Sequence, residues 1–154
     1  MELQTIASKS GLPVRIIRYV LDHKVLHDGP VAQILGAKGQ PRTLTEFEAF
    51  AVVIAGTLIE AGLRRGHVAQ YMGLLLKVRF TLIRGLSDDV IGAVLATKYP
   101  ATAQFANGSM VRITHNGNDT GWLPTPKKAG VEPEFVIEVN LATLRDRLIR
   151  KEKR

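Results

Sequence analysis

The feature that most constrains the fold is an apolar run from Phe47 to Ile59, which follows directly on a helix-start signal. Thr45-Glu46-Phe47-Glu48 matches the capping box, in which Thr and Glu side chains satisfy backbone N–H groups at a helix start. The pattern predicts a helix from Glu46 to Ala61. Its predicted buried positions are Phe47, Phe50, Ile54 and Leu58, and the others include apolar Ala51, Val52, Ala55 and Ile59. Other elements must therefore cover this helix on more than one side.

The apolar run is not a membrane span, because it contains Glu48, meets Glu60 and falls short of the roughly 20 apolar residues that a bilayer requires. The chain of 154 residues has the usual size of one domain, although two small modules would also fit. It contains no cysteine, which excludes disulfides and thiol catalysis and suits a reducing compartment. No signal peptide is evident, so we expect a soluble, cytoplasmic protein without membrane contact.

The net charge of +7 and a pI of about 10.0 favour a polyanionic partner such as nucleic acid. The excess of positive charge is unevenly distributed along the chain. The first 70 residues hold eight Lys or Arg against six acids, whereas the tail Arg145–Arg154 is strongly basic. A DNA-binding region in the first half must therefore depend on the placement of a few arginines.

The stretch from Leu3 to Leu26 predicts two short helices joined by a turn at Gly11. Gly11 can adopt the positive φ that a tight turn between helices often requires. A second helix over 13–23 would place Arg15, Arg18 and Tyr19 on its outer face. This is the pattern of a helix-turn-helix that reads DNA with its second helix. The alternative is an ordinary helical hairpin with a solvated arginine face.

The segment that follows, 28–43, predicts a β-hairpin-like wing. It contains several Gly and Pro residues, and Lys38 and Arg42 flank Gly39, where backbone could approach a phosphate closely. The alternative is a flexible linker between two helices.

The rest of the chain predicts a mainly α fold with a small α+β C-terminal part. We expect a helix from His67 up to Gly85 and a short one after Ser87 as N-cap, reaching about Lys98. Strands at 103–106 and 110–114 around an Asn-Gly turn, with a third at 135–139, would form a three-stranded antiparallel sheet. A closing helix would start at Asn140. These elements suggest a winged helix-turn-helix with following helices at 1–80 and a small effector or oligomerisation domain at 87–154.

The first 80 residues resemble the MerR family of winged-helix transcription regulators. The matching segments are 6–7, 11–19, Gly39 with Arg42, and 58–64, so the resemblance covers about half the chain. It implies a dimer that binds inverted DNA repeats and responds to a ligand. It also implies DNA contacts from Arg15, Arg18 and Tyr19 in the recognition helix, from the wing, and from Arg64 and Arg65 against backbone phosphate.

The chain departs from the family in its second half, which lacks the long dimerisation helix and metal loop. A looser resemblance links the same module to phage excisionases and terminase small subunits, which are architectural DNA-binding proteins that act in assemblies. Both resemblances imply double-stranded DNA as the partner, but only the first implies transcriptional regulation.

Residues suited to catalysis are few. We find no Ser-His-Asp set, nucleophile elbow or phosphate-binding loop. His23 and His27 have metal-ligand spacing, but two histidines near a helix end are more often a polar terminus. Trp122 could line a ligand pocket or fill the core of the small domain. We therefore predict neither an enzyme nor a metal or cofactor site.

These observations predict a homodimeric, sequence-specific transcription regulator, with a small molecule or a protein as its effector. Its predicted DNA-binding residues are Arg15, Arg18, Tyr19, Lys38, Arg42, Arg64 and Arg65. The dimer contact is expected among the apolar helices between Phe47 and Leu82. The alternative is the phage-type architectural protein.

Overall fold

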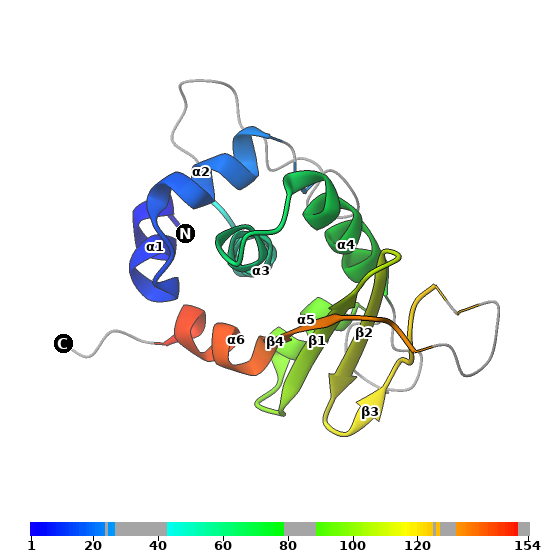
Figure 1. Cartoon of the computed structure of the whole chain (residues 1–154). Coiled ribbons are helices and arrows are strands. Elements are labelled where there is room, and N and C mark those ends of the chain that lie inside the picture. Colours follow the sequence, from blue (N-terminus) through cyan, green and yellow to red (C-terminus); the bar gives the residue numbers. More distant parts are fainter. Residues whose placement is uncertain (24, 27–42, 79–88, 125, 127–131, 151–154) are drawn as a thin grey trace.

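The computed structural model describes residues 1–23, 25–26, 43–78, 89–124, 126 and 132–150. Over these residues the chain forms six helices and one antiparallel sheet (Figure 1). The helices are α1 (Leu3–Ser10), α2 (Val14–Asp22), α3 (Glu46–Glu60), α4 (Arg65–Lys77), α5 (Val90–Ala96) and α6 (Leu141–Ile149). The strands are β1 (Ala101–Ala106), β2 (Met110–His115), β3 (Asn118–Asp119) and β4 (Val136–Asn140).

Helix α3 is the central element, as its apolar sequence predicts. The capping box is present: the Thr45 hydroxyl accepts from the Glu48 N–H, and the Glu48 carboxylate accepts from the Thr45 N–H, both at 3.1 Å. Nine residues between Ala49 and Leu58 are buried. Phe47 is only half-buried, because it lies in the first turn, before the other helices cover α3. Figure 1 shows α3 end-on, with α1, α2, α4 and α6 arranged around it.

The turn between α1 and α2 brings both helices onto α3. Gly11 has a φ of 79° and its N–H donates to the Ala7 carbonyl at 2.9 Å, which ends α1. The approach to α3 is close, because a Cβ at Gly56 would lie 2.9 Å from Leu12 Cδ1 and 3.3 Å from Ile16 Cγ2. These distances are shorter than ordinary van der Waals contacts, so only glycine at position 56 allows this packing without a shift of Leu12 or Ile16.

Helix α4 is shorter than predicted. It starts at Arg65 rather than His67. The preceding helix, α3, ends just before Gly62 (φ 100°), where the Gly62 N–H donates to the Ile59 carbonyl and the Leu63 N–H to the Leu58 carbonyl. Helix α4 ends at Lys77, well before Gly85. Val78 keeps the apolar spacing and is buried, but its backbone is extended and its carbonyl accepts from the Val90 N–H at 3.3 Å. Apolar spacing alone therefore overestimated the helix.

The sheet has four strands, in the order β3-β2-β1-β4, rather than the predicted three. The predicted hairpin is present, and β1 pairs with β2 in the register Ala101↔His115 to Ala106↔Met110. The additional strand, β3, has only two residues and lacks the alternating pattern by which strands are recognised. One face of the sheet packs on α4 and α6, where Phe105, Val111 and Ile113 are fully buried.

Helix α5 begins one residue after Asp89, whose carboxylate caps it by accepting from the Ile91 N–H at 3.0 Å. The predicted N-cap, Ser87, is therefore wrong: the helix starts later, at the last of the polar residues that precede the apolar stretch. The closing helix α6 begins as predicted, with the Asn140 side chain accepting from the Thr143 N–H at 3.0 Å.

A buried arginine fixes α6 to α5 and to the connection before β1. Arg145 is 2% exposed, and its Nη1 donates to the carbonyls of Val94 (3.1 Å) and Tyr99 (2.8 Å). Its Nε donates to the Asp146 carboxylate at 2.9 Å. Val94 belongs to the last turn of α5, where carbonyls lack partners within the helix and favour a cation.

One hydrophobic core runs across the predicted boundary between 80 and 87. It contains Ile6 of α1, Phe50 of α3 and Leu148 of α6, and α6 packs against both α1 and α3. The elements after residue 87 therefore cover the helices before residue 80.

The pH dependence of stability should report on His115. This residue is fully buried in β2, with Nε2 2.9 Å from the Thr97 hydroxyl. Burial, together with the charge of Arg145, lowers the pKa of His115 from its ordinary 6.5. Below about pH 6.5 His115 becomes protonated in the unfolded chain, whereas in the folded protein it stays neutral until the pH approaches its lowered pKa. The free energy of unfolding should therefore fall as pH falls from 6.5 towards the lowered pKa, by up to about 1.4 kcal/mol per unit of difference.

Urea unfolding of the wild type and a His115→Gln variant between pH 7.5 and 5.0 measures this contribution. Glutamine keeps a polar partner for Thr97 and does not titrate, so the variant should lose less stability than the wild type over this range. Equal losses in the two proteins would show that the protonation of His115 does not contribute.

Candidate nucleic-acid interface

Helix α2 presents the predicted recognition residues outwards. Ile16, Ile17, Val20 and Leu21 are buried, which fixes the rotation of the helix. The other side therefore carries Arg15 and Arg18, both exposed, and half-buried Tyr19. Arg15 and Arg18 are three residues apart and so lie on one side of the helix.

The start of α4 lies against the end of α2. Arg65 Nη1 lies 2.5 Å from His23 Nδ1, and the His23 and Tyr19 rings lie 4.3 Å apart between centroids. Because a guanidinium can only donate, Nδ1 must be the accepting nitrogen and the ring proton must lie on Nε2. Arg64 precedes Arg65 as the N-cap of α4 and is also exposed.

Five of the seven predicted DNA-binding residues thus come from two adjoining elements. We call Arg15, Arg18, Tyr19, Arg64 and Arg65 the basic face. The α4 end of this face has no side-chain cap and no acid in its first turn, so its backbone N–H groups add positive potential to that of the arginines. Exposed Asp22 is a carboxylate on the same helix, so the positive charge is not uniform.

The two remaining predicted residues, Lys38 and Arg42, lie outside the described residues, as does nearly all of the predicted wing 28–43. The described chain resumes at Thr43, which pairs antiparallel with Glu2, and the Leu44 N–H donates to the Met1 carbonyl at 2.8 Å. The end of this segment is therefore attached beside the start of α1.

The sequence does not predict the role of His23. Its spacing from His27 suggests only a metal ligand, and His27 lies outside the described residues. In the structure the His23 ring contacts the Tyr19 ring at a tilt of 46°, and His23 links α2 to α4. The available signal was its position four residues after Tyr19, a spacing that brings two side chains together on a helix. Among the described residues, no cluster of three or more His, Asp or Glu side chains could hold a metal ion.

Trp122 is half-buried beside the sheet, and the Arg112 guanidinium carbon lies 6.0 Å from its ring centroid. Arg112 also forms an ion pair with Asp119 on β3, with Nε donating to both carboxylate oxygens at 2.8 and 2.9 Å. This pairing lowers the pKa of Asp119. Arg112 and Asp119 join β2 and β3 through their side chains, and the Trp122 ring lies beside the Arg112 guanidinium.

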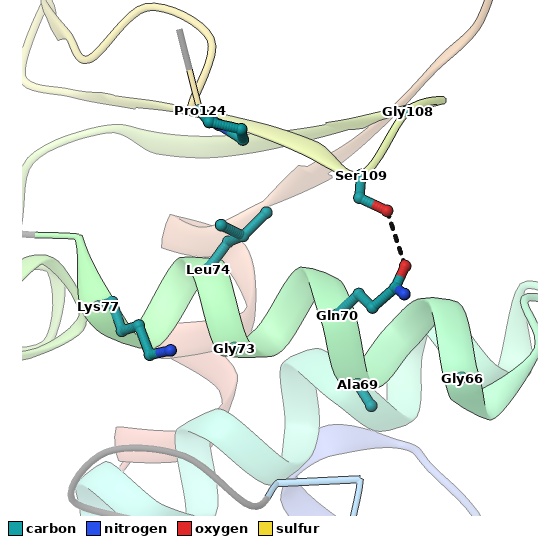
Figure 2. A pocket seen from close by; sticks show the side chains of 9 residues that line it. All are labelled: Gly66, Ala69, Gln70, Gly73, Leu74, Lys77, Gly108, Ser109 and Pro124. Atoms are coloured by element: carbon teal, nitrogen blue, oxygen red, sulfur yellow. Dashed lines mark hydrogen bonds between the residues drawn. The ribbon is translucent and has the colours of Figure 1, made fainter.

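A groove of about 580 Å³ lies between the outer side of α4 and the tip of the β1–β2 hairpin (Figure 2). Figure 2 shows Leu74 extending from α4 towards the opposite wall, where Pro124 lies, and the Ser109 hydroxyl donates to the Gln70 amide oxygen at 2.7 Å across one end. The lining residues are Gly66, Ala69, Gln70, Gly73, Leu74, Lys77, Gly108, Ser109 and Pro124. This volume falls in the range of small-molecule sites.

Comparison with known proteins finds no matching family model, no similar curated protein and no solved structure that resembles this one. In the part of the chain that the structure describes, every helix is too short or too polar to cross a membrane.

Proposed function

We propose that the protein is a DNA-binding transcription regulator that contacts the major groove with α2. The observation that carries this proposal is the basic face, in which the Arg65–His23 contact joins the arginines at the start of α4 to those on α2. Arg15 and Arg18 would reach base edges or phosphates in the groove, and Tyr19 a phosphate. Arg64 and Arg65 would bind the adjoining phosphate backbone, where the helix dipole of α4 also favours an anion.

The proposed regulator acts as a homodimer. We expected the dimer contact among the helices between Phe47 and Leu82, but α3 is buried by the elements around it. We therefore place the dimer contact on a surface other than α3, and keep the groove on the outer side of α4 for the effector.

Selection of bound sequences from a random pool of duplex DNA tests the proposal. A dimer of this kind should enrich an inverted repeat with half-site centres separated by about 10–10.5 base pairs or a multiple of that. Recovery of DNA without any enriched sequence would contradict a sequence-specific regulator.

The second candidate function is an architectural DNA-binding protein that acts in an assembly. It uses the same basic face and differs in the absence of an effector. Deleting residues 87–154 cannot discriminate between the two, because α5 and α6 cover α3 and their loss would expose the core. A better discriminator is a small molecule that changes DNA affinity in the wild type but not in a Gly73→Leu variant, whose added side chain would fill the groove. Such a result favours the regulator.

A further inference from the structure

The basic C-terminal part of the chain contains both a buried arginine and exposed arginines. Arg145 is buried and its guanidinium is used by the carbonyls of Val94 and Tyr99, so it adds nothing to the surface. Arg147 and Arg150 are exposed. They are three residues apart at the end of α6 and therefore emerge on one side of it.

The position of these two arginines is set by the packing of α6. Leu141, Leu144 and Leu148 are buried, and the helix packs on α3 and on α1. Figure 1 shows that the last turn of α6 lies beside α1, the helix that leads into α2. The arginines therefore lie beside α1, which the turn at Gly11 connects directly to α2 of the basic face.

The charge at this position is not neutralised within the described part of the chain. The nearest acid in sequence, Asp146, accepts from buried Arg145 at 2.9 Å. No ion pair involving Arg147 or Arg150 occurs among the described residues. Two exposed cations that hold no partner among the described residues are available to an external polyanion.

We infer that Arg147 and Arg150 form a second DNA contact, which binds the phosphate backbone beyond the site occupied by α2. This inference rests on the proposed function, because DNA held on the basic face is the polyanion closest to α6. Duplex DNA carries about one negative charge per 1.7 Å of axis, so a duplex that passes α2 continues to present phosphates along its length. The contact is independent of the DNA sequence, since two arginines on a helix end reach phosphates and not base edges.

Salt-dependent binding of the full chain tests the inference. For duplex DNA, the slope of log K against log salt falls by about 0.9 for each phosphate contact that is lost. Arg147→Gln and Arg150→Gln should each reduce the slope by about that amount, and the double variant by about twice as much. The loss should be equal on the selected sequence and on random duplex DNA. Lys98→Gln is the matched control: it removes one exposed charge after α5, outside both the basic face and α6, and it should leave the slope unchanged.

Two results would overturn the inference: an unchanged slope in the double variant, or a loss confined to the selected sequence. Failure of the proposed function looks different. In that case the wild type would show no sequence preference, and an Arg15→Gln/Arg18→Gln variant would bind like the wild type. Thermal unfolding of each variant should match the wild type, because all the substituted side chains are exposed.

Discussion

Replacing Arg145 with methionine should lower the free energy of unfolding by about 3 kcal/mol, since hydrogen bonds to a charged group contribute about 1.5–3 kcal/mol each. Methionine keeps much of the length and apolar volume of arginine, so the substitution removes the guanidinium and leaves little cavity. It deprives the Val94 and Tyr99 carbonyls of their donor. A buried carbonyl without a partner also costs its desolvation energy.

The measurement is urea or thermal unfolding, in which a loss of this size should lower Tm by roughly 6–12 °C for a chain of this length. Arg147→Met is the matched control, because it makes the same change two residues later at an exposed position. Its effect should stay within about 0.5 kcal/mol. Equal stabilities of the Arg145→Met and Arg147→Met proteins would refute a stabilising role for the buried guanidinium.

The second large effect concerns DNA binding. Arg15→Ala and Arg18→Ala should each weaken binding to the selected site by about 1–3 kcal/mol, or roughly 5- to 150-fold, which is the contribution of one good base contact. Both side chains are exposed on α2, so the folded state should persist in both variants. The discrimination against random DNA should fall with the affinity, if these arginines read bases.

Mobility-shift titrations at fixed salt measure both quantities. Lys98→Ala, which removes an exposed charge after α5, should bind like the wild type. Binding that is unchanged in Arg18→Ala would exclude this residue from the interface. Equal losses on selected and random DNA would instead assign it to phosphate contact.

The sequence predicts the helices with strong local signals. The capping box at Thr45 and the all-apolar surface of α3 correctly predict a central helix, and Asn140 correctly marks the start of α6. These signals succeed because capping and burial depend on neighbours within one or two turns. The end of α4 and the start of α5 are less predictable, because they depend on a contact between residues distant in sequence. The Val90 N–H, directly after the cap at Asp89, donates to the carbonyl of extended Val78.

In the candidate site, too, some features follow from local sequence signals and others depend on contacts between distant residues. Helical spacing identifies Arg15, Arg18 and Tyr19 as outer residues of α2, because the buried positions of the helix define its inner side. The contact of Arg65 with His23 joins residues 42 positions apart and depends on how α4 leaves α3. Neither this contact nor the burial of Arg145 has a local signature, and both are visible only when the helices are packed.

The glycine at position 56 links the evolution of three positions: one in the turn before α2, one in α2 and one in α3. Any larger residue there would press on Leu12 and Ile16, so it would require either a shift of these side chains or a smaller residue at one of them. In relatives of this protein the size of residue 56 should therefore vary inversely with the combined size of residues 12 and 16. Such compensating changes would mark the α2–α3 contact in an alignment even where the arginines of the basic face have diverged.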